Sequence, residues 1–397
     1  MSLIAQGLLY PLMFVIVISI VIVIHELGHY WAGRYFGAAV ESFSMGFGKS
    51  IFEIKDKNNT RWRVNWLPLG GFVNFVAEDG IIENEGKASD QNEDLPEAEK
   101  PVGRPFTELS AGARIVVALA GPFANFILAI GIFASLGMIL GDPIQRITVA
   151  EVMEDSVAEA AGILPGDVFV TVNGREANRQ KVILEEIKLS SNDTVDLEML
   201  RGEELVEISL VPQRETRTNA IGITERTGFI GVALQRELVD RNRLNPVSAV
   251  GYGVSETFGT ISSSIDMLGR IVTGRESIQQ LSGPVGIANV AGGMARTTLE
   301  AEQVSLGTRL YMLLMSNLQL VAFISVAVGF FNLLPLPILD GGVVVFNTYE
   351  AVTGKGLSEE LLLKSKFITL VFLAVLAIFI TLGDFEEAGL LELFRGL

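Results

Sequence analysis

Both histidines of the chain lie in one short segment, His25-Glu26-Leu27-Gly28-His29, directly after a long apolar run. On an α-helix, residues i and i+4 share a face, so the two imidazoles can bind one divalent metal ion with Glu26 beside them. Such an ion acidifies water, and a nearby carboxylate can accept its proton. The spacing predicts metal-assisted hydrolysis with Glu26 as catalytic base. The alternative is a helix end whose polar residues only mark a membrane interface.

A third metal ligand must come from another part of the chain, because a catalytic zinc site typically has three protein ligands and one open position. The sequence contains no cysteine and no further histidine, so the ligand must be a carboxylate. Asp340 is the best candidate, since it ends a third apolar run in which Pro335 and Pro337 interrupt regular helix. For this segment alone, a proline-broken span exit capped by Asp340 is the alternative.

The segment before Asp340 also offers groups that could bind a substrate. Asn332 has an amide that could bond an extended peptide backbone or an oxyanion, although packing between spans explains it equally well. Irregular backbone at membrane depth is tolerated where protein packs around it or where it lines a wet cavity. We therefore take Asn332, Pro335 and Pro337 as candidate substrate-binding residues.

Composition excludes several classes of protein. Of the 397 residues, 49% are apolar and only 19% are charged, which excludes an intrinsically disordered chain and makes an ordinary soluble enzyme improbable. The formal charge of −16 argues against a nucleic-acid-binding protein, which would concentrate basic residues on one face. Without cysteine there is neither a disulfide nor a thiolate metal site.

Four charge-poor stretches are long enough to cross a lipid bilayer as helices, which takes about 20 apolar residues. A signal peptide is the weaker interpretation of the first stretch, because no basic residue precedes it and no cleavage site follows. The excess of basic residues near residues 34–114 and 341–366 predicts that these loops are cytoplasmic. Both termini and residues 142–309 are then outside, although Arg296 and Arg309 do not fit this scheme.

Between the spans, residues 40–76 alternate apolar and polar side chains around Asp56-Lys57-Asn58-Asn59, which predicts a β-hairpin. The acidic, proline-containing stretch after it predicts a flexible linker. Further along, a strand, a short helix and several β-rich runs predict a compact α+β module of about 70 residues, an ordinary domain size. The stretch after it predicts amphipathic helices near the outer surface.

The fold class expected is an α-helical integral membrane protein with four spans, an inserted α+β domain and a membrane-associated β-hairpin. In chain order, we expect a first span with the histidine motif (1–35), the hairpin (36–77), an acidic cytoplasmic linker (78–113) and a second span (114–141). The module (142–215) and a strand with amphipathic helices (216–308) follow. The chain ends with a third span (309–341), a cytoplasmic loop (342–366) and a fourth span with the C-terminal tail (367–397).

Together these motifs resemble the bacterial site-2 proteases, and more narrowly their regulator of sigma-E protease subgroup. The resemblance covers nearly the whole chain. It rests on the histidine motif after an apolar span, Gly121-Pro122-x-x-Asn125 in the second span, one module with the PDZ-like stretch AGILPGDVFVTVNG, and the stretch from Asn332 to Gly341 with the pattern NxxPxPxLDG.

The resemblance implies an intramembrane zinc endopeptidase of the bacterial inner membrane, with His25, His29 and Asp340 as Zn²⁺ ligands and Glu26 as base. Its substrates would be single-span membrane proteins, such as anti-sigma factors already cut on the outer side, or remnant signal peptides. The PDZ-like module, outside with both termini, would filter substrates by size. The hairpin would hold the substrate as an added strand, which opens its helix for attack.

Two features depart from the family pattern. Val343 follows Gly341-Gly342 where relatives often have histidine, and the PDZ-like module occurs once where some relatives have two. The rival function is a non-catalytic four-span scaffold whose outer module binds peptide termini. A transporter is less favoured, because four spans without internal repeats fit that class poorly.

Overall fold

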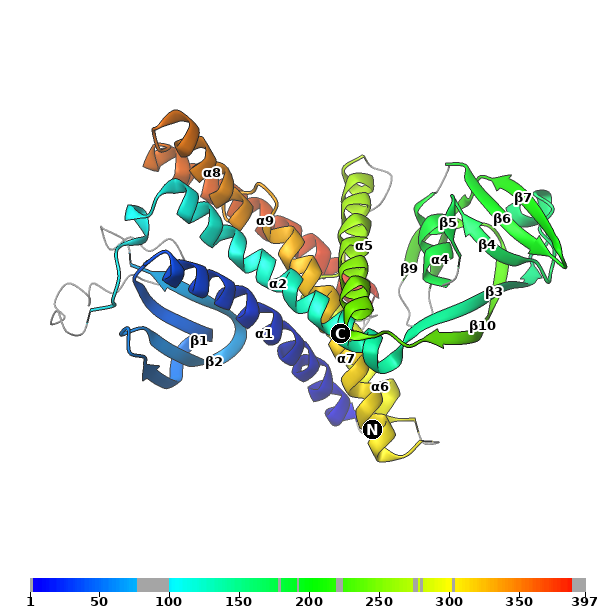
Figure 1. Cartoon of the computed structure of the whole chain (residues 1–397), viewed down its shortest axis with the longest axis horizontal. Coiled ribbons are helices and arrows are strands. Elements are labelled where there is room, and N and C mark those ends of the chain that lie inside the picture. Colours follow the sequence, from blue (N-terminus) through cyan, green and yellow to red (C-terminus); the bar gives the residue numbers. More distant parts are fainter. Residues whose placement is uncertain are drawn as a thin grey trace, which may run out of the picture. The chain divides into compact units, whose positions relative to one another are not determined.

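The computed structural model describes residues 3–76, 100–177, 180–190, 193–218, 224–273, 278, 281–301 and 304–387. The chain forms two compact units. One contains the long apolar helices and a β-hairpin, and the other contains an inserted β-sheet (Figure 1). The predicted linker falls largely in residues 77–99, outside the described residues.

Four helices in the described part of the chain are long and apolar enough to cross a membrane. These are α1 (Leu3–Tyr35), α2 (Ala111–Leu140), α7 (Leu306–Asn332) and α9 (Glu359–Glu387). In α1 the apolar run continues without a break into the histidine motif, so the two histidines lie on one helix as the i, i+4 spacing requires. Val17 and Val21 of α1 pack against Val321 and Ile324 of α7 in a buried cluster.

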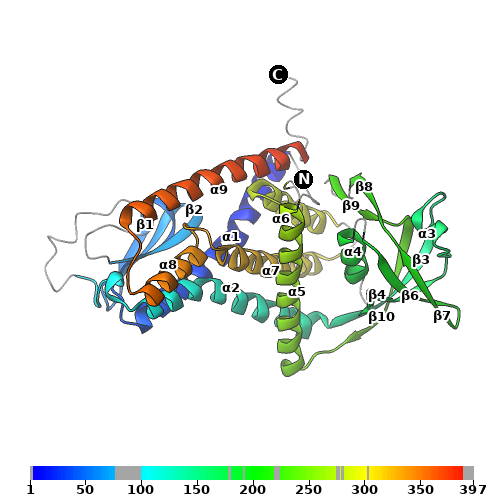
Figure 2. The ribbon, with the colours of Figure 1, turned by 90° about the horizontal axis from the view of Figure 1, so that it is seen from above.

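The predicted hairpin consists of β1 (Val40–Lys55) and β2 (Arg61–Phe75), which pair antiparallel. Residues 42–45 have partners both in 61–64 and in 71–74, so β2 extends along both edges of the first half of β1. The hairpin lies beside α1 in both views of the chain (Figures 1 and 2). A short 3₁₀ turn, Phe106–Glu108, precedes α2.

The third apolar helix is shorter than the predicted span 309–341. Helix α7 ends at Asn332, and the chain then passes through an irregular connection containing Pro335 and Pro337 before α8 (Asp340–Thr353) begins. The prolines explain this end, since each lacks an N–H donor and disfavours helix in the residue before it. Asp340 therefore starts a helix instead of ending one. Much of the predicted loop 342–366 is the α8 helix.

Two further helices follow the inserted sheet. The first, α5 (Pro246–Val272), begins with Asn245, whose side chain accepts hydrogen bonds from the N–H groups of Val247 and Ser248. The second, α6 (Pro284–Leu299), contacts α1 and α7. The buried carboxylate of Asp384, on α9, accepts hydrogen bonds from the N–H groups of Gly283, just before α6, and Gly286, in its first turn, and so satisfies donors that a helix start leaves open.

The inserted unit is built on an antiparallel sheet with strand order β10-β3-β4-β6-β7, and β5 pairs with β4. Two more strands, β8 and β9, form a separate pair. The sheet reaches Asn242 and so extends past residue 215, where we expected the module to end. Its strands and helices are β3 (Asp142–Val152), α3 (Val157–Ala160), β4 (Val168–Val172), β5 (Arg175–Glu176), α4 (Gln180–Leu189), β6 (Val195–Arg201), β7 (Glu204–Leu210), β8 (Gln213–Thr218), β9 (Thr224–Phe229) and β10 (Val232–Asn242).

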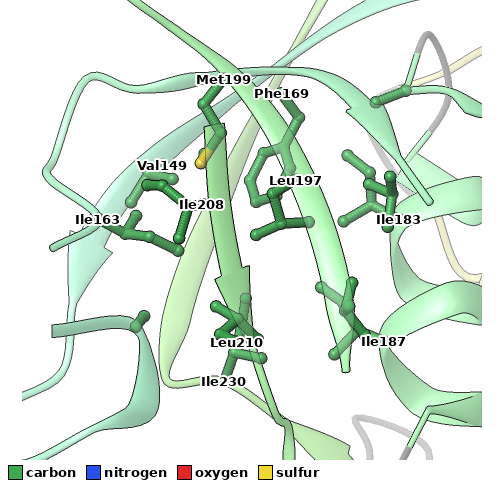
Figure 3. Close-up of a cluster of buried hydrophobic side chains, with 14 of the residues drawn as sticks. Val149, Ile163, Phe169, Ile183, Ile187, Leu197, Met199, Ile208, Leu210 and Ile230 are labelled. Carbon is green, nitrogen blue, oxygen red and sulfur yellow. The ribbon is translucent and has the colours of Figure 1, made fainter. Parts of the chain in front are cut away.

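Alternation of side chains along the strands produces the core of this unit (Figure 3). Leu197 and Met199 of β6 are buried, while the residues between and around them face outward or are partly exposed. Ile183 and Ile187, four residues apart on α4, present one apolar stripe to the same core. Because these residues form their own buried cluster, the module has the core of a domain.

Candidate metal centre

The structure brings the three predicted ligands together. His25 Nε2 lies 3.2 Å from His29 Nε2 and 3.2 Å from Asp340 Oδ2, and His29 Nε2 lies 3.4 Å from Asp340 Oδ1. The two imidazoles come from α1, and the carboxylate comes from the first residue of α8. The side chains are at most 19% exposed. In the described residues, these three form a group of donors that could hold one metal ion.

The spacing and chemistry of this group fit zinc. Nitrogen and oxygen ligands bind zinc at about 2.0–2.2 Å in a tetrahedron, which places neighbouring ligand atoms about 3.3–3.6 Å apart. The three contacts, at 3.2, 3.2 and 3.4 Å, lie within or just below that separation. Asp340 Oδ2 is buried and has no hydrogen-bond partner among the described residues, and buried carboxylate oxygens are normally satisfied. A cation bound between the three side chains would satisfy it.

Glu26, the predicted base, lies near the three candidate ligands. It interacts electrostatically with His25, His29 and Asp340, and the backbone N–H of Val73 in β2 donates a hydrogen bond to its carboxylate. A Cβ atom added at Gly71, on the same strand, would lie 3.6 Å from Glu26 Cγ and 2.9 Å from the Ser44 carbonyl oxygen. The end of β2 therefore packs directly on the helix turn that carries Glu26.

Helix α2 positions both imidazoles from a single stripe of residues spaced four apart, Val117, Gly121 and Asn125. The Val117 carbonyl oxygen lies 2.8 Å from His29 Nδ1, and Asn125 Nδ2 lies 3.2 Å from His25 Nδ1. A Cβ atom at Gly121 would come within 2.6 Å of His29 atoms and 2.9 Å of His25 Cε1. Only glycine leaves room for the two rings at this point.

The connection from α7 to α8 places Asp340 by close backbone packing. A Cβ atom at Gly341 would meet the carbonyl oxygens of Leu333 and Leu334 at 2.3 Å, so the start of α8 folds tightly against the end of α7. Asn332 is the last residue of α7, while Pro335 and Pro337 lie in the connection. Substrate binding by these three residues stays a prediction.

A network at the hairpin turn, which the sequence analysis did not recognise, ties the hairpin to the ligand helix. Asp56 accepts hydrogen bonds from the Tyr30 hydroxyl at 3.1 Å, the Trp62 indole at 3.3 Å, and the N–H groups of Asn58 and Thr60. Burial alone raises the pKa of Asp56, but these bonds lower it below its ordinary value. Tyr30 directly follows His29, so the turn is anchored one residue from a predicted metal ligand.

The hairpin also contains an open pocket of about 510 Å³. Its lining mixes polar and aromatic groups and includes an ion pair between Arg63 Nε and Glu53 at 2.9 Å. The residues that line it all belong to the two strands: Ser44, Phe47, Gly48, Ser50, Glu53, Arg63, Asn65 and Phe72.

Comparison with known proteins identifies the family. The model of peptidase family M50 matches residues 13–376. The chain belongs to this family. Metalloprotease MmpA of Caulobacter vibrioides is 36% identical over 355 residues, 87% of each chain. A candidate zinc metalloprotease of Mesorhizobium japonicum is 36% identical over 358 residues, 90% of this chain and 92% of the relative.

Membership of family M50 confirms the site-2 protease resemblance seen in the sequence. The predicted fold class of a four-span helical protein with an inserted α+β module is confirmed as well. Among solved structures, the PDZ domain of an SdrC-like protein from Listeria innocua is 25% identical and covers 23% of this chain and 93% of its own, with a TM-score of 0.19. Membrane association of the hairpin stays a prediction.

Proposed function

We propose that this M50 chain is an intramembrane zinc endopeptidase that cleaves the membrane segments of single-span proteins. One observation carries the proposal: two imidazoles and one carboxylate, a donor set suited to zinc, lie within 3.2–3.4 Å of one another, and helices of the same chain are long and apolar enough to cross a membrane. The names of the relatives from Caulobacter vibrioides and Mesorhizobium japonicum support a metalloprotease, and the second supports zinc.

The residues of the site have distinct roles in this proposal. His25, His29 and Asp340 hold the ion, which when bound supplies Lewis-acid polarisation of the scissile carbonyl group and acidifies water. Glu26 accepts a proton from the attacking water and delivers it to the leaving nitrogen of the cleaved peptide bond. Neither histidine is available for proton transfer, because the Nε2 atom of each ring, which faces the site, would bind the ion.

The hairpin presents the substrate to this site. A transmembrane helix hides its peptide bonds, so the segment must become extended before attack, and pairing with a strand edge supplies hydrogen bonds for that conformation. The end of β2 lies against Glu26, which is the correct place for such pairing. Exposed apolar side chains on the hairpin, including Phe52, Trp66 and Leu67, favour its contact with lipid. Asn332, Pro335 and Pro337 contact the substrate from the opposite segment.

We infer the partners from the family resemblance and the location from the arrangement of the spans. With four spans in the bacterial inner membrane, the inserted module and both termini are on the periplasmic side, and residues 34–114 are cytoplasmic. The module then excludes substrates whose outer domains have not been removed. Anti-sigma-factor-like proteins cut on the outer side, and remnant signal peptides, are the substrate class. Such a protease acts in regulated intramembrane proteolysis.

Cleavage of a single-span substrate by the purified full-length protein tests this proposal. Glu26→Gln should bind as much zinc as the wild type but cleave about 10²–10⁴-fold more slowly, because the proton acceptor is lost. Glu359→Gln, at the exposed start of α9, is the matched control and should cleave normally. A metal chelator should stop the wild-type reaction. Normal cleavage by Glu26→Gln would rule out Glu26 as the base, and a zinc-loaded wild type that cleaves nothing would favour the scaffold.

A further inference from the structure

The residues of α2 that face the two histidines offer different hydrogen-bonding groups to the two Nδ1 atoms. A neutral imidazole that binds a metal through Nε2 carries its proton on Nδ1, so Nδ1 must face a hydrogen-bond acceptor. For His29 that acceptor is the Val117 carbonyl oxygen at 2.8 Å. A backbone carbonyl only accepts, so this contact sets the His29 ring in the state that leaves Nε2 open for a metal ion.

For His25 the group at the same position is the side-chain amide of Asn125, which can either donate or accept. Its nitrogen faces His25 Nδ1 at 3.2 Å. Donation from this nitrogen would leave the ring proton on Nε2, the atom that faces His29 and Asp340, and would block metal binding. The amide as oriented therefore suits a metal-free ring.

Within the part of the chain that the structure describes, the Asn125 amide oxygen has no partner that would fix the amide with its nitrogen toward His25. Asn125 is fully buried, and its Oδ1 has no hydrogen-bond partner among the described residues. The oxygen and nitrogen of an amide have nearly the same shape, so partners decide which of them faces a given atom. We infer that in the metal-loaded protein the amide oxygen of Asn125 accepts the Nδ1 proton of His25, and that Asn125 is a positioning residue for this ligand.

The surroundings of Asn125 support a fixed position for this acceptor. The Ser325 hydroxyl on α7 donates a hydrogen bond to the Asn125 backbone oxygen at 2.9 Å, and both residues are fully buried. Close packing of α1 on α2, where a Cβ at Gly28 would lie 2.3 Å from the Ala120 oxygen, prevents the ring from moving away. Groups that orient metal-bound histidines in this way typically change metal affinity 10–100-fold when removed.

This inference rests on the proposed zinc site, and zinc affinity tests it without a cleavage assay. The full-length protein in detergent is titrated with zinc against a competing chelator. Asn125→Leu, which keeps the side-chain size but lacks an acceptor, should bind zinc about 10–100-fold more weakly. Asn125→Asp keeps an acceptor and should bind close to wild type. Asn347→Leu is the matched control, because Asn347 is also buried but donates to Val343 on its own helix.

Nuclear magnetic resonance provides a second readout, because the chain contains only two histidines. With ¹⁵N-labelled histidine, both rings of the zinc-loaded wild type should carry the proton on Nδ1. Asn125→Leu should lose the slowly exchanging Nδ1–H signal of one ring. The inference is overturned if Asn125→Leu binds zinc like the wild type, if Asn125→Asp weakens binding as much as Asn125→Leu, or if one wild-type ring lacks an Nδ1 proton.

Where Asn125→Leu does not fold, the inference is still overturned if one wild-type ring lacks an Nδ1 proton or if Asn125→Asp binds zinc about 10-fold or more weakly than the wild type. The proposed function can fail separately: a protein that binds zinc with the expected ring protonation but cleaves no substrate would refute the protease and leave the role of Asn125 intact. A wild type that binds no zinc would overturn both.

Discussion

Two buried carboxylates, one in each unit of the chain, have opposite surroundings. Asp167 in the inserted sheet accepts two hydrogen bonds of 2.8 Å from the Arg201 guanidinium and one of 2.9 Å from the Leu164 N–H. Asp340 in the membrane unit faces two imidazole nitrogens at 3.2 and 3.4 Å, and its Oδ2 has no hydrogen-bond partner among the described residues.

This difference separates a structural carboxylate from a functional one. The fork of Arg201 satisfies both oxygens of Asp167, and the charges neutralise each other, so this group needs no ligand. Asp340 remains incomplete until a cation joins the imidazoles, since leaving a buried carboxylate unsatisfied costs free energy. The Asp167 side chain is 1% exposed and that of Asp340 is 19% exposed, and the unsatisfied oxygen of Asp340 makes it the candidate ligand of the two.

The largest effect is expected from Asp340→Ala. Removing the only carboxylate of the three-ligand group leaves two imidazoles, which do not complete a catalytic zinc site. We expect zinc bound per protein, measured by elemental analysis after dialysis, to fall from one equivalent to near zero. The polar contacts that the structure shows for the Asp340 carboxylate are with the two imidazoles, and its Oδ2 has no hydrogen-bond partner among the described residues, so we expect the helices to remain folded.

The matched control is Asp167→Ala, which removes a carboxylate of the same size from the inserted sheet. Zinc content should be unchanged in this variant, and only the stability of the module should fall. Full zinc occupancy in Asp340→Ala would show that another residue supplies the third ligand. Zinc loss in both variants would show that the two carboxylates do not differ as described.

The sequence predicted the site better than the contacts around it. His25, Glu26 and His29 were predicted as site residues because their spacing is local to one helix, and Asp340 was predicted because few ligand types remained; the structure brings the three candidate ligands close together. The sequence contained the motif with Asn125 but did not predict a role for this residue. Its contact with His25 joins two helices and residues 100 positions apart. Spacing along α2 could have indicated a shared face, but not which helix lies opposite.

The fold shows the same division between local and long-range information. The hairpin turn at Asp56 and the four apolar helices follow from local pattern. The end of α7 at Asn332 could also have been placed from Pro335. In contrast, the pairing of β10 with β3 joins residues about 90 positions apart, and composition of either strand alone does not reveal it.

A smaller effect, on the stability of the inserted sheet, is expected when acid protonates Asp167 and weakens its ion pair with Arg201. The hydrogen bond from Arg201 is the main cause that lowers the pKa of Asp167. Its stabilising contribution is therefore complete above the unfolded pKa of about 3.9 and is lost as pH falls through the lowered folded pKa. Asp167→Asn, which mimics protonation, should lose about 2 kcal/mol at neutral pH. Hydrogen exchange of β4 and β6 amides in the full-length protein, corrected for intrinsic rates, measures this.

At low pH the wild type and Asp167→Asn should converge in stability, since the carboxyl group is then neutral in both. If the change in hydrogen exchange on acidification is confined to the amides of β4 and β6, the contrast with Asp340 is strengthened. A constant difference between the two proteins from neutral pH down to pH 2 would contradict the role given to the Asp167 charge.

The smallest effect is expected where the hairpin is attached to the ligand helix. Tyr30→Phe removes the hydroxyl that bonds Asp56 but keeps the ring that packs on Phe43 and Trp62. Loss of one hydrogen bond costs about 1 kcal/mol, which is about fivefold faster hydrogen exchange at the hairpin turn. Tyr35→Phe is the control, because Tyr35 is 85% exposed on the same helix. Equal exchange in the two variants would show that Asp56 is held by its other donors alone, whereas a change in zinc affinity with Tyr30→Phe would show that the hairpin also positions His29.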